Sequence, residues 1–153
     1  MEQPNVRLEA MTEESLDDVL KIQKESFGKE SRSDFLNCIS RSEVYSYFVL
    51  VDEKKNVIGY YGTMNISGDG ELLTIAVKTE HRGKGYGELM LRSAVLSAAL
   101  KGSTKMFLEV DETNKPAIGL YAKFGFVPIS KREKYYGENA AIIMEYDIEK
   151  NAK

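Results

Sequence analysis

The sequence predicts an α/β fold with one mixed sheet in a single domain. Segments rich in β-branched and aromatic residues alternate with segments whose apolar residues recur at helical spacing. The chain of 153 residues is long enough for one domain with a full hydrophobic core and too short for two domains of typical size. We assign residues 1–153 to this domain, with its core at about 5–148, and expect the order β-α-α-β-β-β-α-β-α-β-β.

The first half of the chain is expected to contain four strands and two helices. A short strand over 5–10 precedes a helix that Thr12 can cap and that runs to about Glu25, with its apolar residues on one face. A shorter helix is expected over 34–40. Three strands follow, and the turn EKKN makes the first two a hairpin; their expected ranges are 45–52, 57–67 and 71–77.

The second half begins with a glycine-rich segment and a long helix that ends near Leu100. The next strand spans 105–110. Asn114, as cap, and Pro116, in the first turn, predict a further helix, and Gly125 ends it. The segments FVPISKREKYY and AAIIMEYD are predicted to be the last two strands.

Charge and composition exclude several kinds of partner. The formal net charge of −3 at pH 7 argues against a nucleic-acid binder that relies on phosphate contacts. One cysteine, Cys38, and one histidine, His81, exclude an intrachain disulfide and are too few for a zinc site, so no metal is expected. The acidic start is unlike a signal peptide, and no apolar run approaches the about 20 residues of a membrane span. We expect a cytoplasmic protein that binds no membrane.

The glycine-rich segment follows a strand and opens a helix, which is the arrangement of an anion site. The first N–H groups of a helix have no partner, and glycine lets the backbone approach a phosphate closely. Three glycines and two basic residues fall within the six positions 82–87, which favours phosphate over a tight turn that merely needs glycine. A Walker loop is absent, and the dinucleotide fingerprint fails because Glu88 stands at its last glycine position.

The segment Arg82-Gly83-Lys84-Gly85-Tyr86-Gly87 fits the pattern R/Q-x-x-G-x-G/A, and here the chain resembles the GNAT acetyltransferase family. TIAV before the loop, and LEVDETNKPAIGLYAKFGF and KYYGENAAIIM after it, are similar to the N-terminal protein acetyltransferases. These include RimI-type enzymes and the archaeal and eukaryotic NatA catalytic subunits. The resemblance extends from about Val6 to Ile148. It implies a GNAT fold, with a mostly antiparallel sheet of six to seven strands, a splayed parallel central pair and about four helices.

The resemblance also implies a cofactor site for acetyl-CoA, used as co-substrate. The glycine-rich loop would bind its pyrophosphate, and the pantetheine arm would pair with backbone between the splayed strands. Asn114 would hydrogen-bond the cofactor, although the residues alone also allow a plain helix cap. The implied cofactor contacts are Ile75, Ala76, Val77, Arg82, Gly83, Lys84, Gly85, Tyr86, Gly87, Asn114 and Tyr121.

Three residues are implied to carry the chemistry. Glu109, in FLEV, matches the position of the general base in RimI-type enzymes; the alternative is a structural ion pair, because burying an unpaired charge is costly. Tyr121 matches a tyrosine beside the cofactor sulfur, where a phenol with a pKa of about 10 can protonate the leaving thiolate. Its alternative is a packed aromatic ring. Glu71, on the other splayed strand, is a second base or an anchor for the substrate amine.

The implied substrate contacts are Phe27, Tyr135 and Tyr136. The chain departs from RimI-type sequences at both places: Gly-Lys-Glu follows Phe27 where Pro and Trp are usual, and the segment after the tyrosines is short. Cys38 lies on an apolar helical stripe and is not expected to be a nucleophile. His81 precedes the phosphate loop and is expected beside the pyrophosphate or in solvent rather than as a base.

The sequence therefore favours acetyl transfer from acetyl-CoA to the α-amino group of a protein or peptide N-terminus. Direct attack by the bound amine is expected, with general base and acid help. Acetylation of polyamines, small amines or lysine side chains is the alternative among enzymes. A non-catalytic acyl-CoA-binding module and a generic phosphate-ligand protein are the alternatives of other classes. The preferred N-terminal residues, ribosome proximity, an auxiliary subunit and the oligomeric state stay open.

Overall fold

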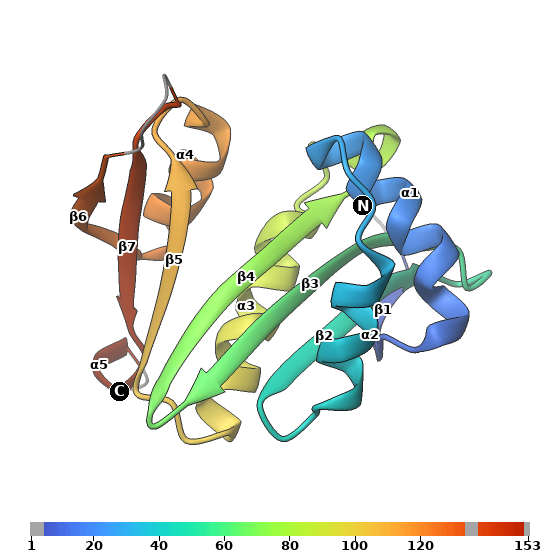
Figure 1. The fold of residues 1–153 in the computed structure, drawn as a ribbon, viewed down its shortest axis with the longest axis horizontal. Coiled ribbons are helices and arrows are strands. Elements are labelled where there is room, and N and C mark those ends of the chain that lie inside the picture. The colour runs from blue at the N-terminus through green and yellow to red at the C-terminus, as the bar shows by residue number, and fades with distance from the viewer. Residues whose placement is uncertain (1–4, 134–137, 152–153) are drawn as a thin grey trace.

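The computed structural model describes residues 5–133 and 138–151, which form a seven-stranded sheet in the order β1-β2-β3-β4-β5-β7-β6 (Figure 1). The strands are β1 Val6–Ala10, β2 Tyr45–Asp52, β3 Val57–Ile66, β4 Asp69–Val77, β5 Lys105–Asp111, β6 Val127–Arg132 and β7 Ala141–Asp147. The helices are α1 Leu16–Phe27, α2 Arg32–Ser40, α3 Tyr86–Leu100, α4 Lys115–Phe124 and the short α5 Ile148–Asn151. Two 3-10 turns span Glu13–Ser15 and Thr79–His81.

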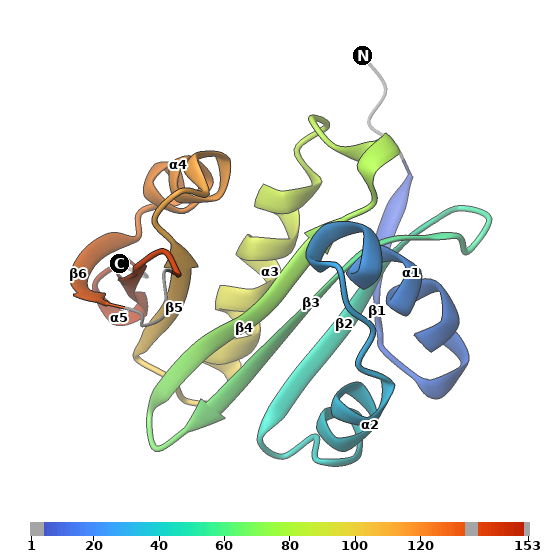
Figure 2. The same cartoon turned by 45° about the horizontal axis from the view of Figure 1, so that its top comes forward.

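All neighbouring strands are antiparallel except β4 and β5, which run parallel. Helices α1 and α2 cover one face of the sheet, and α3 and α4 lie on the other, as the two views agree (Figures 1 and 2). The predicted fold class and order of elements are therefore confirmed. The structure adds α5, which follows β7 directly. No helix in the described residues is both long and apolar enough to span a membrane.

Several boundaries differ from the sequence prediction. The first helix starts at Leu16 rather than after Thr12, because the hydroxyl of Ser15 accepts a hydrogen bond from Thr12 N–H and donates one to the Thr12 carbonyl, closing a 3-10 turn. The helix continues past Glu25 to Phe27 and ends at Gly28, whose φ of 75° is left-handed. Helix α2 and strand β4 each begin two residues earlier than predicted, at Arg32 and Asp69.

Two apolar clusters hold the helices to the sheet. The cluster on the side of α3 and α4 joins residues of both halves of the sheet: Leu50, Ile58, Tyr61, Leu72, Tyr86, Met90, Leu91, Ala94, Ala98, Met106, Leu108, Val110, Tyr121, Phe126, Met144 and Ile148. The cluster on the side of α1 and α2 contains Met11, Leu16, Val19, Leu20, Ile22, Phe35, Val49, Val51, Val57, Tyr60 and Ala76. The second cluster has no members on β5, β6 or β7, so the described helices leave that face of these strands uncovered (Figure 1).

Strands β4 and β5 pair only at their beginnings. The parallel ladder runs over four residue pairs, from Asp69↔Lys105 to Leu72↔Leu108. Over the described residues 73–77 and 109–111 the two strands no longer pair, and Figure 1 shows them diverging toward the top of the view. The predicted splay of the central parallel pair is confirmed.

A β-bulge in β4 lies at the start of this divergence. The register against β3 jumps between Gly62↔Thr74 and Thr63↔Leu72, which leaves Leu73 as an extra residue. Leu72 and Ile75 both pack toward α3, although strict alternation would send residues three apart to opposite faces. The extra residue therefore lets both halves of β4 contribute to the same core while the strand bends away from β5.

Candidate functional site

The loop before α3 has the backbone of an anion site. Gly83 and Gly85 adopt left-handed φ angles of 80° and 86°, and Gly85 is the N-cap of α3. A Cβ at either glycine would meet nothing within 4 Å, so the backbone conformation rather than space requires glycine there. The first N–H groups of α3 have no intrahelical partner, and the helix dipole adds positive potential at this end.

The side chains of the loop have different surroundings. Arg82 folds back: its Nε donates to the carbonyl of Val77 at 3.0 Å, and its guanidinium donates to the hydroxyl of Ser26 at 3.1 Å. The ring of Tyr86 is buried in the core under α3, so Tyr86 can offer a ligand its backbone N–H but not its side chain. Lys84 is exposed, and Gly87 faces Leu120 of α4, whose Cδ2 would lie 3.3 Å from an added Cβ.

A second contact ties the same loop to the end of α1. The carboxylate of Glu25 accepts hydrogen bonds from the hydroxyl and from the backbone N–H of Thr79, the latter at 2.6 Å. These hydrogen bonds, the side-chain one first, lower the pKa of Glu25 below its usual value, and the positive charges of Arg82 and Lys78 lower it further. The end of α1 is therefore held to the segment that leads into the phosphate loop by two contacts, Glu25 with Thr79 and Ser26 with Arg82.

The diverging part of β4 presents the backbone that the sequence analysis assigns to a cofactor. Ile75 and Val77 pack toward α3, whereas Ala76 is buried under α1 and α2. One edge of this segment pairs with β3, from Gly59↔Val77 to Tyr61↔Ile75, and the edge that faces β5 has no strand partner. The unpaired edge leads directly to the phosphate loop. The strand edge suits the amides of an extended arm, and the loop suits a phosphate group, so together they fit a ligand that carries both.

Asn114 and Tyr121 stand at the two ends of one helix. The Oδ1 of Asn114 accepts a hydrogen bond from Ala117 N–H at 3.3 Å, which confirms the predicted cap of α4. Tyr121 lies in the last turn of α4, with its ring centroid 6.0 Å from that of Phe126. Its side chain is 8% exposed, and this burial raises the pKa of Tyr121 to about 12. The hydroxyl makes no hydrogen bond with the described residues.

Glu109 stands one residue past the last parallel pair, where β5 leaves β4. Its side chain is 39% exposed and belongs to the face opposite α3 and α4, because Leu108 and Val110 on either side of it are core residues. Arg132 of β6 forms an ion pair with it. The ion pair considered for Glu109 in the sequence analysis is thus present, at the surface rather than in the core.

Glu71 and Tyr121 flank Glu109 differently. Glu71 is exposed and pairs with Phe107 in the parallel ladder. Phe107 and Glu109 are two residues apart on β5, so Glu71 lies on the same face as Glu109, about 7 Å back along the strands. Tyr121 belongs to the core on the opposite face. Glu109, just past the last parallel pair, and Tyr121, in the core under α4, therefore lie on opposite faces of the sheet.

The expected substrate residues are only partly described. Phe27, the last residue of α1, is 52% exposed beside the contacts that tie α1 to the phosphate loop. Tyr135 and Tyr136 lie outside the described residues. Cys38 is half-buried on α2, and the ring of His81 lies 6.4 Å from that of Tyr86 at the entrance to the loop.

Sequence reasoning missed Arg132, the bulge at Leu73, and the contacts of Glu25 and Ser26 with the loop. Each depends on residues brought together by pairing across the sheet or by packing of α1. Glu109 and Arg132 are 23 positions apart in the sequence, and Glu25 and Thr79 are 54 apart. No local pattern in the chain signals such pairs.

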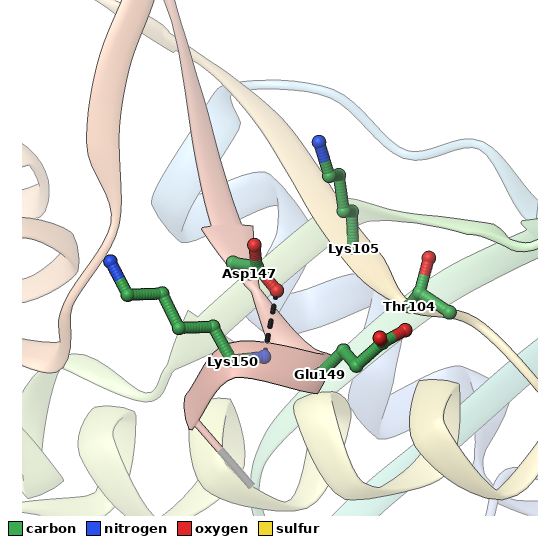
Figure 3. A pocket seen from close by; sticks show the side chains of 5 residues that line it. All are labelled: Thr104, Lys105, Asp147, Glu149 and Lys150. Atoms are coloured by element: carbon green, nitrogen blue, oxygen red, sulfur yellow. Dashed lines mark hydrogen bonds between the residues drawn. The ribbon is translucent and has the colours of Figure 1, made fainter. Parts of the chain in front are cut away.

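A shallow hollow of about 340 Å³ lies at the opposite end of β5 and is a poor candidate for this chemistry. Figure 3 shows the residues that line it: Thr104, Lys105, Asp147, Glu149 and Lys150. The backbone N–H of Lys150 donates to Asp147 at 2.9 Å, which caps the turn into α5. The charges are of both signs, and those of Lys105, Glu149 and Lys150 are exposed. No group of three metal-ligating side chains occurs in the part of the chain that the structure describes.

Comparisons with known proteins agree with this geometry. Residues 8–126 match the acetyltransferase (GNAT) family. A Bacillus subtilis protein provisionally named a ribosomal protein bS18-alanine N-acetyltransferase is 34% identical over 142 residues, which cover 92% of this chain and 91% of that protein. The crystal structure of the ribosomal-protein-S18-alanine N-acetyltransferase from Escherichia coli is 25% identical, with a TM-score of 0.83 and 94% of each chain covered.

Ard1 from Thermoplasma volcanium, an archaeal relative in structure, shares the fold, with a TM-score of 0.83 over 93% of this chain and 97% of that one at 20% identity. The family match covers well over half of the chain, and the similarity to the Bacillus subtilis protein extends across both halves of the sheet. The chain belongs to the GNAT family of acetyltransferases, and it is an N-acetyltransferase similar to the RimI-type enzymes.

Proposed function

We propose that this protein transfers the acetyl group of acetyl-CoA to the α-amino group of a protein N-terminus. Its similarity to the Bacillus subtilis relative, which is provisionally named for N-acetylation of an alanine of ribosomal protein bS18, extends over nearly the whole of both chains. The observation that carries the proposal is the position of Glu109, a carboxylate at the point where β4 and β5 part, on a face that the described helices leave open.

The phosphate loop and β4 would hold acetyl-CoA. The α3 N-terminus with Gly83 and Gly85 in left-handed conformations would bind the pyrophosphate through backbone N–H groups. The unpaired edge of Ile75 to Val77 would hydrogen-bond the amides of the pantetheine arm and place the thioester between the strands. Asn114 already caps α4 through Oδ1, and its amide nitrogen would donate to the cofactor.

Two side chains of this chain would move the protons. The substrate nitrogen attacks the thioester carbonyl carbon, a C–N bond forms, and the C–S bond breaks. Glu109 would accept the proton that leaves the nitrogen, directly or through a water molecule, and Tyr121 would donate its proton to the departing sulfur. Burial keeps Tyr121 in the protonated form that this role needs. Glu71 would anchor the incoming amine on the same face.

An N-terminal amine makes a modest demand on such a base. A peptide α-amino group has a pKa of about 7.7–8.0, so a useful fraction is neutral at pH 7, whereas a lysine side chain, at about 10.4, is almost fully protonated. A surface carboxylate is therefore sufficient for an N-terminal substrate. Phe27, exposed at the end of α1, would contact the first residue of the peptide.

The test is acetyl transfer from acetyl-CoA to short peptides that begin with Met, Ser, Ala or Glu. Matched peptides with a blocked N-terminus and an internal lysine, and spermidine, serve as controls for the other acceptors. We expect transfer to free N-termini, with at least a tenfold preference in kcat/KM over the blocked peptides.

Turnover only on blocked peptides or spermidine would contradict the N-terminal assignment while leaving the acetyltransferase chemistry intact. Binding of acetyl-CoA with no turnover on any acceptor, unchanged by Glu109→Gln or Tyr121→Phe, would instead indicate a non-catalytic binding module.

A further inference from the structure

We propose that Arg132 is a positioning residue that holds and neutralises the carboxylate of Glu109 for proton transfer. This inference rests on the proposed function and adds to it a residue that neither the glycine-rich motif nor the cofactor contacts include. It starts from the ion pair that joins the end of β6 to the divergence of β4 and β5.

The sheet register brings the two side chains to one face. Arg132 pairs with Ala141 of β7, and Ala141 pairs with Asp111 of β5, so Arg132 and Asp111 lie in one row across the sheet. Residues in one row point to the same face, and Glu109 precedes Asp111 by two positions on that face. Arg132 therefore reaches diagonally across β7 to the carboxylate. Oδ1 of Asp111 accepts a hydrogen bond from the backbone N–H of Thr113 at 2.8 Å.

The geometry of the ion pair leaves one oxygen of the Glu109 carboxylate free to accept a proton. The guanidinium donates to Oε1 of Glu109, and Oε2 makes no hydrogen bond with the described residues. One oxygen is thus held by a planar group that orients its partner, and the other stays available to accept a proton. Because the Glu109 side chain is 39% exposed, it would otherwise sample several rotamers in solvent.

Charge gives Arg132 a second effect. A peptide N-terminus arrives largely as an ammonium ion, and an unneutralised carboxylate attracts this form, which cannot attack a carbonyl. The guanidinium balances the charge of Glu109, so the ammonium gains less by ion pairing and loses its proton more readily. Removing Arg132 should therefore lower kcat without raising the KM of the peptide.

Lys131 provides a matched control on the same strand. It forms ion pairs with Glu112 at 3.4 Å and Glu133 at 3.8 Å, and its side chain is 53% exposed against 57% for Arg132. As the adjacent strand residue, Lys131 belongs to the other face. Exposed ion pairs contribute little to folding stability, so Lys131→Met and Arg132→Met should both fold and differ in catalysis alone.

The experiment measures kcat and KM for the best acceptor in the panel above, at saturating acetyl-CoA. The variants are Arg132→Met, Arg132→Lys, Lys131→Met, Glu109→Gln and the double variant Arg132→Met/Glu109→Gln. We expect Arg132→Met to lower kcat about 10- to 100-fold, which is part of the about 10²- to 10⁴-fold that general base catalysis contributes. Arg132→Lys should restore part of this loss, and Lys131→Met should resemble wild type.

Non-additivity is the decisive readout. If Arg132 acts through Glu109, the double variant has a kcat within about twofold of Glu109→Gln alone. An unchanged kcat in Arg132→Met, a raised peptide KM as its main effect, or a full additional loss in the double variant would overturn the inference. An inactive wild-type protein would overturn the proposed function and this inference with it, whereas an active one with normal Arg132→Met kinetics overturns the inference alone.

Discussion

At the scale of single residues, the surroundings of Tyr121 keep its hydroxyl protonated. Burial against the core raises its pKa to about 12, above the ordinary value of 10.0. A raised pKa favours the neutral form in the folded state. The resulting contribution to stability is complete below pH 10 and is lost as the pH rises through about 12. Throughout the neutral range, the hydroxyl of Tyr121 therefore remains protonated.

We expect Tyr121→Phe to lower kcat about 10²-fold or more, because the sulfur then leaves without a proton donor. The hydroxyl makes no hydrogen bond with the described residues, so the free energy of unfolding should change by less than about 1 kcal/mol. Steady-state kinetics and thermal unfolding check both parts.

Tyr61→Phe is the matched control for this prediction. The hydroxyl of Tyr61 is hydrogen-bonded to Ser93 at 2.9 Å and to Ser97 at 3.1 Å, inside the core under α3. Its removal should cost about 1–2 kcal/mol of stability and leave kcat intact. A Tyr121→Phe variant with wild-type kcat would exclude Tyr121 as the acid.

At the scale of elements, the turn between β4 and α3 combines a conformational requirement with two anchors. Gly83 and Gly85 supply the left-handed conformations, Arg82 binds the end of β4 and the end of α1, and Glu25 binds Thr79. Both anchors lie before the glycines and tie the start of the loop to β4 and α1. The first exposed residue beyond these anchors is Phe27, so the segment expected to meet the substrate is attached to the segment expected to meet the cofactor.

Gly85→Ala should lower the free energy of unfolding by about 1–2 kcal/mol, the cost of a left-handed conformation for a residue with a Cβ. It should also raise the KM for acetyl-CoA several-fold, because relief of the strain moves the N–H groups at the start of α3. Thermal unfolding and initial rates at varied acetyl-CoA concentration measure the two effects.

Gly119→Ala is the control for the element scale. Gly119 lies inside α4 with a helical φ, and a Cβ there would meet nothing within 4 Å. This substitution should stabilise the protein by about 0.5–1 kcal/mol and leave the KM for acetyl-CoA unchanged. If both alanine variants raised the KM equally, a special role for the conformation of Gly85 would be ruled out.

At the scale of the whole molecule, the divergence of β4 and β5 separates the sheet into two parts that only four residue pairs join directly. The cluster under α3 and α4 compensates for this weak joint. It unites Leu50 and Ile58 from one part with Leu108 and Met144 from the other. The molecule can therefore keep an open strand edge at its centre because the shared core, rather than the sheet ladder, holds its two parts together.

Leu108→Ala should consequently weaken both parts together. Leu108 is 3% exposed and stands in the last parallel pair, so we expect a loss of about 2–5 kcal/mol. For a chain of this size the loss corresponds to a fall in Tm of roughly 5–20 °C. Hydrogen exchange should rise in β3 and in β7 alike.

Leu96→Ala, on the outer side of α3 where Leu96 is 59% exposed, should change the stability by no more than about 0.5 kcal/mol. Faster exchange confined to β5, β6 and β7 in Leu108→Ala would mean that the two parts unfold independently, contrary to this prediction.

The order of strands and helices could be predicted from the sequence because it depends on local composition and periodicity. The β-branched and aromatic residues of β2 and β3 and the helical stripe of α1 are properties of neighbouring residues. The ends of α1 were less predictable, because Ser15 and Gly28 set them through hydrogen bonds and backbone conformation. Tyr135 and Tyr136 remain sequence-based predictions.

By itself, the sequence determined the family, the glycine-rich loop, the cap at Asn114 and the residue types suited to acetyl transfer. Each of these depends on short runs of neighbouring residues. Only the tertiary structure decided which groups meet. Pairing across the sheet joined Arg132 to Glu109, the bulge at Leu73 set the point where β4 bends away from β5, and packing of α1 joined Glu25 to Thr79. These contacts depend on the register of strands and the docking of helices, which are settled by the packing of the whole core.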